Sequence, residues 1–329
     1  MRSKFIDNYK GLLIILVVWA HFIELILPHG KWLYTAIYFF HMPAFIFCTG
    51  YFSGFNFKKI FSGLIIPYVI LQLVFIGFEN FFFNTSKACQ FHTPHWLLWY
   101  VFAVAVWRIL IPVFDRKNRV SKIFIFVLAV VIAIVSGFWK NAGYKYSLSR
   151  ILVYTPFFLL GYYGRKEGIE RIRGIKVVRW IALAVIFTFL LYVEFVAKNF
   201  HTKWLYSAYP FSRAGYNIGI RFQILLWGFL ITLALFTLVS DRESFITKIG
   251  RNSGNIYYLH GFLVRALFYT EFFEKILFDF AFATVFALAE IMILSGNFIT
   301  KPLNFIISGR FFINLVKLPE KMLKKYQKL

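Results

Sequence analysis

Four ionisable residues lie at the edge of the first apolar run or inside it, in "MRSKFIDNYKGLLIILVVWAHFIEL": Asp7, Lys10, His21 and Glu24. On a helix, Lys10 and His21 share one face and lie about 16 Å apart along the axis. Asp7 lies about 40° around the helix from His21 and about 21 Å from it. Glu24 follows His21 by one turn, where a carboxylate can orient an imidazole or raise its basicity. The pattern predicts an ion pair at one end of the helix and a general base at the other.

The second apolar run adds a histidine, His41, in "YFFHMPAFIFCTGYFSG". Two histidines in the outer halves of consecutive antiparallel helices can converge on one cavity, where His41 would bind an acceptor or assist proton transfer. An ionisable side chain inside a membrane span costs about 3 kcal/mol or more, so it usually faces a partner, a cavity or a pathway. A structural alternative stays open, in which Asp7 and Lys10 mark the helix start and both histidines contact neighbouring helices.

The composition indicates a membrane protein. Of 329 residues, 60% are hydrophobic and 16% charged, and apolar runs of about twenty residues recur along the chain. We therefore predict an all-α, polytopic integral membrane protein of the cell (plasma) membrane with about ten transmembrane helices. Their expected ranges are 5–27, 34–54, 62–83, 95–114, 122–139, 150–164, 178–197, 217–239, 254–273 and 279–299. The sixth carries Pro156 and is expected to be short, and broken or tilted.

The distribution of Lys and Arg predicts that both termini are cytoplasmic. With the N-terminus inside, 25 of these residues fall in cytoplasmic segments and 10 in external ones. Residues 1–300 are expected to form one transmembrane domain, and 301–329 an interfacial helix with a basic cytoplasmic tail, an eleventh span being the alternative. The net charge of +23 follows from this topology and from attraction to anionic lipids. No nucleic-acid recognition module is visible, whereas a cationic inner face suits an anionic ligand such as a nucleotide.

The remaining polar residues are expected to be mostly structural. No phosphate-cradling loop and no metal-ligand spacing occurs, so we expect neither ATP-driven pumping nor a bound metal. His260 is expected to join helices in the cytoplasmic half of its span. Solvated positions are expected for His92, His95 and His201, and inter-helix pairs for Glu79, Asn80, Arg108, Glu194, Arg265 and Glu290.

Five segments, in this order, resemble the integral membrane acyltransferase-3 proteins, and within them the fucose 4-O-acetylase-like branch. They are "IDNYKGLLIILVVWAH", "FFHMPAFIFCTGYFSG", "WLLWYVFAVAVWRIL", "SRILVYTPFFLLGYYGRK" and "GRNSGNIYYLHGFLV". The first is the most specific, since it matches a basic residue, ten intervening residues and a histidine. The resemblance spans nearly the whole chain.

The resemblance implies transfer of an acyl group, usually acetyl from cytoplasmic acetyl-CoA, to a hydroxyl of a cell-envelope saccharide or lipid-linked saccharide. It makes His21 the catalytic histidine and Lys10 its basic partner. From this and the spacing described above, we expect Asp7, Glu24 and His41 to be catalytic residues beside His21, and Lys10 to bind the cofactor. Lys10 stands where much of the family has Arg, so a bidentate grip on phosphate is not available there. His21 would act as a general base, an acyl-histidine intermediate being the alternative.

Two further features are expected to contact substrates. Arg150, at the outer edge of the sixth predicted helix, is predicted with Lys10 as a cofactor-binding residue: it could polarise an acyl oxygen or hold the acceptor, and an interfacial anchor is the alternative. The outer loop "NFHTKWLYSAYPFSRAGYN" gathers aromatic residues and is a candidate acceptor surface or an interfacial belt. A secondary transporter or flippase for an envelope precursor remains the alternative function, although no inverted repeat is visible. Three points stay open: the identity of the acceptor, the choice between acetyl and another short acyl group, and the oligomeric state.

Overall fold

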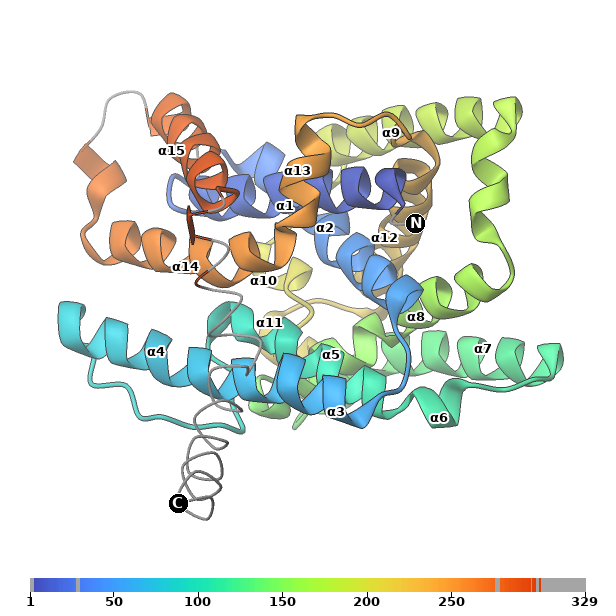
Figure 1. The fold of residues 1–329 in the computed structure, drawn as a ribbon, viewed down its shortest axis with the longest axis horizontal. Coiled ribbons are helices and arrows are strands. Elements are labelled where there is room, and N and C mark those ends of the chain that lie inside the picture. Colours follow the sequence, from blue (N-terminus) through green and yellow to red (C-terminus); the bar gives the residue numbers. More distant parts are fainter. Residues whose placement is uncertain (1–2, 28–29, 276–278, 297, 300–301, 303–329) are drawn as a thin grey trace, which may run out of the picture.

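Every regular element in the described part of the chain is a helix (Figure 1). The computed structural model describes residues 3–27, 30–275, 279–296, 298–299 and 302. The helices are α1 (Lys4–Glu24), α2 (Lys31–Phe52), α3 (Phe57–Ile60), α4 (Ile66–Phe83), α5 (Trp99–Ile109), α6 (Ile111–Phe114), α7 (Arg119–Val135), α8 (Leu148–Lys166), α9 (Lys176–Phe195), α10 (Thr202–Leu205), α11 (Phe211–Ala214), α12 (Ile218–Leu238), α13 (Phe245–Arg251), α14 (Ser253–Tyr269) and α15 (Asp279–Leu294). The predicted tail lies outside the described residues, apart from Pro302.

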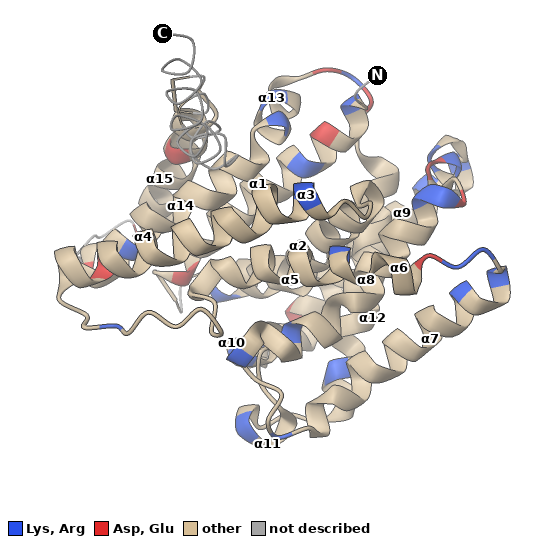
Figure 2. Cartoon of the chain, turned by 60° about the horizontal axis from the view of Figure 1, so that its bottom comes forward, with Lys and Arg blue, Asp and Glu red and all other residues tan. Residues whose placement is uncertain are grey.

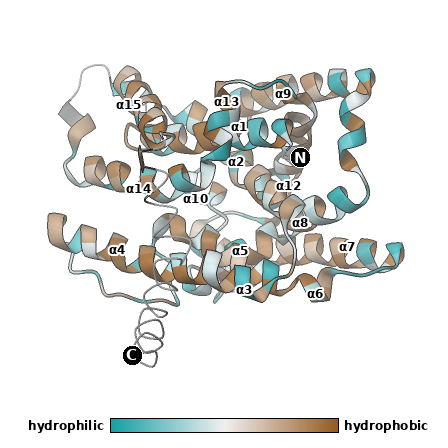
Figure 3. Cartoon of the chain, in the orientation of Figure 1, coloured by the Kyte–Doolittle hydropathy of each residue, from teal (hydrophilic) through white to brown (hydrophobic). Residues whose placement is uncertain are grey.

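The prediction of an all-α, polytopic membrane protein is confirmed. Within the described residues, six helical segments are long and apolar enough to cross a membrane: Lys4–Glu24, Lys31–Phe52, Phe57–Phe83, Arg119–Phe138, Lys176–Phe195 and Ile218–Leu238. Apolar residues dominate the helices, and the charged residues gather mainly at helix ends and in the connections (Figures 2 and 3). The other predicted runs form α5, α8, α14 and α15, which are shorter or more polar. Ten spans and cytoplasmic termini therefore remain predictions.

Helix α8 differs from its prediction, because it continues unbroken from Leu148 to Lys166 with Pro156 inside it. It packs along α2 on one side and α7 on the other. This packing holds the helix on both sides of the proline, so the missing backbone N–H does not end it.

Helix α2 lies at the centre of the fold, where it contacts α1, α8, α9 and α12. Its crossing with α8 is close, because Gly50 faces the backbone of Phe158, and Gly161 faces the backbone of Phe47 and Tyr51. An added Cβ at either glycine would overlap a carbonyl oxygen of the other helix. Small residues therefore set the distance between these two helices, as is usual in membrane bundles.

Replacing Gly161 with Ala should destabilise the fold, because the added methyl group forces α2 and α8 apart. Overpacking of this kind costs about 1–3 kcal/mol. Gly77→Ala on α4 is the matched control, since nothing lies within 4 Å of the new Cβ there. Alanine in place of a helix-interior glycine should stabilise this control by about 0.5–1 kcal/mol. Thermal unfolding of the purified protein in detergent measures both, and a midpoint for Gly161→Ala at or above that of Gly77→Ala would contradict the close crossing.

Candidate functional site

Asp7 and Lys10 form an ion pair at the start of α1. The Lys10 Nζ lies 2.9 Å from Asp7 Oδ1, and Arg251 Nε of α13 lies 3.7 Å from Asp7 Oδ2. Helix α13 reaches α1 because Gly11 and Gly250 leave no side chain between the two backbones. The Asp7 side chain is only 3% exposed, so its two cationic neighbours offset the cost of burying a carboxylate. Asp7 therefore belongs with Lys10 and lies about 21 Å along the helix from His21.

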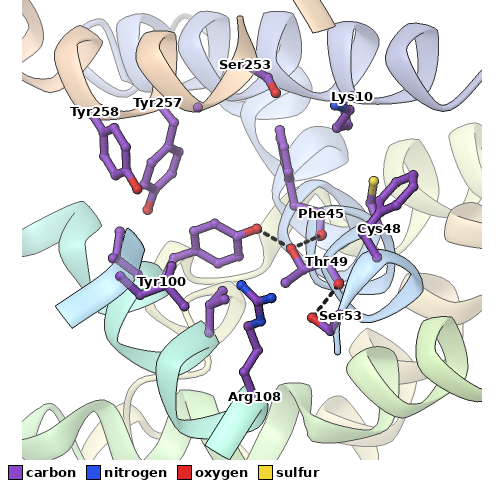
Figure 4. A pocket seen from close by; sticks show the side chains of 15 residues that line it. Lys10, Phe45, Cys48, Thr49, Ser53, Tyr100, Arg108, Ser253, Tyr257 and Tyr258 are labelled. Carbon is purple, nitrogen blue, oxygen red and sulfur yellow. Dashed lines mark hydrogen bonds between the residues drawn. The ribbon is translucent and has the colours of Figure 1, made fainter. Parts of the chain in front are cut away.

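Lys10 faces a cavity of about 300 Å³ between α1, α2, α5 and α14 (Figure 4). Thr49 of α2 and Tyr100 of α5 line it and hydrogen-bond to each other. Tyr257 and Tyr258 of α14 line it from the side opposite α5. The walls are mainly apolar and aromatic, with cationic groups at two places. We call this space the Lys10 cavity.

Arg108 of α5 is the second cation of the Lys10 cavity, opposite Lys10 (Figure 4). Its guanidinium donates to the carbonyl oxygen of Gly54 at 3.3 Å, and its buried Nε has no hydrogen-bond partner among the described residues. No described carboxylate forms an ion pair with it, so the predicted inter-helix pair is wrong for Arg108. The sequence signal that could have identified Arg108 as a cavity residue is its position inside an apolar run, because an intramembrane arginine usually faces a partner or a cavity.

His21 lies near the other end of α1, and every hydrogen bond it makes among the described residues involves Nδ1. Nδ1 is 3.4 Å from Glu24 Oε2 and 3.2 Å from the Tyr38 hydroxyl. A proton held on Nδ1 toward the carboxylate leaves Nε2 with a free lone pair. The side chain is 13% exposed, so the imidazole is nearly enclosed. This arrangement suits a histidine that accepts a proton at Nε2.

Glu24 accepts hydrogen bonds from three sides. Tyr38 of α2 donates to Oε2 at 3.1 Å, and Tyr206, from the loop after α10, donates to Oε1 at 2.8 Å. Burial and the nearby carboxylate raise the pKa of Tyr206 above its usual value, so its hydroxyl stays protonated and donates. Tyr34 donates in turn to the Tyr206 oxygen at 3.0 Å. Together these bonds fix the carboxylate that faces His21.

Two more histidines, His41 and His260, lie near His21. His41 is buried on α2, with Nδ1 3.0 Å from the carbonyl oxygen of Ile37, and its ring contacts Tyr38. His260 is buried on α14 with its ring stacked on His21, centroids 5.4 Å apart. Its Nδ1 is 3.0 Å from the Ile256 carbonyl oxygen, and its Nε2 has no hydrogen-bond partner in the part of the chain that the structure describes. His260 therefore lies at the same depth as His21, so the two predictions, His21 in the outer half and His260 in the cytoplasmic half, do not both hold.

A second cavity, of about 150 Å³, contains His21, Glu24 and His41 in its wall, and we call it the His21 cavity. Trp96 lies 4.9 Å from the His21 ring, and Trp99 lies further along the wall. Arg150 also lines this cavity; its Nε donates to the Tyr206 carbonyl oxygen at 3.1 Å, and its guanidinium lies 4.9 Å from the Trp99 ring. The structure therefore groups Arg150 with His21, and not with Lys10 as the cofactor-binding prediction grouped it.

One side chain, Tyr257, lines both cavities. Its hydroxyl donates to the carbonyl oxygen of Leu97, which lines the His21 cavity. Its ring also contacts Tyr100 in the wall of the Lys10 cavity. Tyr257 therefore forms part of the wall of each cavity. Tyr257 did not stand out in the sequence, because tyrosines are frequent in its apolar runs, whereas Tyr206 lies in the aromatic outer loop that was predicted as a candidate acceptor surface.

Glu79 and Arg265, each predicted to form an inter-helix pair with an unspecified partner, pair with each other. Arg265 Nε lies 2.5 Å from Glu79 Oε1, and Lys87 also pairs with this fully buried carboxylate. His95 Nε2 lies 3.0 Å from Glu79 Oε2, and its side chain is 10% exposed. The predicted solvated position of His95 is therefore wrong, since burying a carboxylate requires donors on several sides.

The other predicted pairs differ among themselves. Asn80 hydrogen-bonds the loop at Lys87, and Glu194 lies 3.6 Å from Lys198 at the surface. Glu290 is buried, and its Oε2 has no partner among the described residues. His201 is exposed and caps α10, whereas His92 is half-buried beside Tyr146. In the described ranges no group of three or more His, Cys, Asp and Glu side chains is arranged to hold a metal ion.

Comparison with known proteins identifies the chemistry. The model of the Acyltransferase domain, Acyl_transf_3, matches residues 3–300. Nodulation protein NolL of Sinorhizobium fredii (strain NBRC 101917 / NGR234) is 31% identical over 186 residues, which are 49% of this chain and 48% of that protein. The match thus spans about half the length of this relative. No solved structure matches the chain. The enzyme prediction is confirmed over the transporter or flippase, and the chain belongs to the acyltransferase 3 family of membrane O-acyltransferases.

Proposed function

We propose that the protein moves an acetyl group from cytoplasmic acetyl-CoA to a hydroxyl of a cell-envelope saccharide. The observation that carries this proposal is the pair of cavities along α1. One has Lys10 and Arg108 in its wall, the other has His21, whose Nε2 makes no hydrogen bond to a described residue, and Tyr257 lines both. A long donor with phosphates at one end and a thioester at the other fits this arrangement.

His21 is the general base in this proposal. Its Nε2 takes the proton of the acceptor hydroxyl while that oxygen attacks the thioester carbonyl carbon. The C–S bond then breaks, and the leaving thiolate of CoA receives the proton from Nε2. Glu24 holds Nδ1–H and stabilises the imidazolium that forms between the two transfers. His41 and Arg150 would position the acceptor from the far wall of the His21 cavity.

The lining of the His21 cavity suits a sugar. Trp96, Trp99 and Tyr144 contribute aromatic rings to this lining, and Arg150 and Glu24 contribute polar groups. Aromatic faces pack against the C–H face of a sugar ring, and the polar groups can pair with its hydroxyls. The name of the nodulation relative does not state an acceptor. The assignment of a saccharide as acceptor is therefore based on this lining and on the resemblance of the sequence to fucose 4-O-acetylases.

The proposal needs the Lys10 end of α1 to face the cytoplasm, as the Lys and Arg distribution predicts. The chain offers a direct test, because Cys89 is free and exposed in the loop after α4 whereas Cys48 is buried. A membrane-impermeant maleimide added to intact cells should label the protein at Cys89, and Cys89→Ser should abolish this labelling of the protein. Labelling that requires permeabilised cells would reverse the orientation.

His21→Ala should leave a folded protein and lower acetyl transfer about 10²- to 10⁴-fold, the usual contribution of general-base catalysis. Glu24→Gln keeps the shape of the side chain and should lower the rate less. His201→Ala is the matched control, since this histidine is exposed and outside both cavities. Radiolabel passing from acetyl-CoA into envelope saccharide measures all three. Near wild-type transfer by His21→Ala would contradict the proposed base.

Lys10→Ala should raise the KM for acetyl-CoA about 10- to 100-fold, because a charge-assisted contact to phosphate contributes about 1.5–3 kcal/mol. The KM for the acceptor should stay unchanged. Lys4→Ala is the control from the same end of α1, since Lys4 is exposed and pairs with Glu243. An unchanged KM for acetyl-CoA would show that Lys10 acts only in topology or folding.

A further inference from the structure

Two more cavities adjoin the Lys10 cavity where α2 and α8 end. One, of about 500 Å³, shares Lys10 and Phe52 with it. The other, of about 220 Å³, shares Ser53 with it. The two adjoining cavities have Tyr51 and Arg165 in common. Lys10 therefore lies between a region lined by several charged side chains and the mainly apolar cavity along α5.

Arg165 is the cation of this region that has no acidic partner. It donates to the carbonyl oxygen of Tyr51 at 3.2 Å, and no ion pair joins it to a described carboxylate. The two acids that line the larger cavity already have partners. Asp7 lies between Lys10 and Arg251, and Glu170 accepts a hydrogen bond from the Tyr51 hydroxyl.

Aromatic rings lie against the guanidinium of Arg165. The rings of Tyr51 and Phe52 are each 5.7 Å from it, and Phe52 is 46% exposed. Lys166 lies beyond Arg165, over the Tyr162 ring and paired with Asp115. An exposed aromatic surface beside an arginine whose charge is not neutralised suits a ligand with both a planar base and a phosphate.

We infer that this region binds the nucleotide end of CoA, with Arg165 contacting the 3′-phosphate and the adenine lying on the exposed ring of Phe52. The inference rests on the proposed function and assigns the two ends of the donor to separate cavities. The guanidinium can grip a phosphate in bidentate fashion, which Lys10 cannot. Lys10 and Arg108 then face the diphosphate and the pantetheine arm, and the thioester extends toward Tyr257 and His21.

The test compares acetyl-CoA with acetyl-dephospho-CoA, which lacks only the 3′-phosphate. In the wild type the KM for the dephospho donor should be about tenfold higher or more. Arg165→Gln should raise the KM for acetyl-CoA by a similar factor and leave that of the dephospho donor nearly unchanged, so that the ratio of the two approaches one. Arg165→Lys should give an intermediate ratio. Arg179→Gln, at an exposed arginine near the start of α9, is the charge-matched control and should keep the wild-type ratio.

Binding of adenosine 3′,5′-bisphosphate to the purified protein, measured by calorimetry, gives a readout independent of transfer. Binding weakened about tenfold in Arg165→Gln supports the site even if no acetyl transfer occurs, which would contradict only the proposed function. A wild-type KM ratio near one, or a ratio that Arg165→Gln leaves unchanged while transfer proceeds, overturns the nucleotide site and leaves the proposed function standing. If Arg165 binds an anionic lipid and not CoA, Arg165→Gln should leave the KM ratio unchanged.

Discussion

The hydrogen bonds to Glu24 are the interaction on which the His21 site depends. A carboxylate inside a membrane protein is unfavourable unless donors surround it, and here the donors come from α1, α2 and the loop after α10. The carboxylate therefore joins three separate parts of the chain at one point. The same bonds leave a single free nitrogen on His21, directed away from Glu24, so the packing of the fold and the chemistry of the site have a common origin.

Helix α1 sets the distance between the two ends of the site. A helix is stiff, so Lys10 and His21 stay about 16 Å apart along its axis. Helices α2, α5 and α14 then build one cavity at each of these residues, with Tyr257 in the wall of both. In our account the donor bridges this distance with its flexible arm. The protein does not need to move a charged cofactor across the membrane, which would be far more costly than moving an acetyl group.

The helices could be predicted from the sequence because apolar runs of about twenty residues have few alternatives in lipid. The proximity of Glu24 to His21 could be predicted for a similar reason, since helical spacing along one run defines it. Contacts between helices could not, because hydropathy gives neither the rotation of a helix nor its neighbours. The neighbours of His260, His95 and Arg108 were not predicted for this reason. Each lies beside a residue distant in sequence: His21, Glu79 and Gly54, respectively.

The central claim is that donor and acceptor meet from opposite sides of the membrane along α1. The most direct measurement uses sealed vesicles of known orientation that contain the protein, with radiolabelled acetyl-CoA on the side of Lys10 and an envelope saccharide only on the side of His21. If donor and acceptor meet in this way, radiolabel should enter the saccharide while CoA stays on the side of Lys10. Transfer only when both substrates share one side of the vesicle would contradict it.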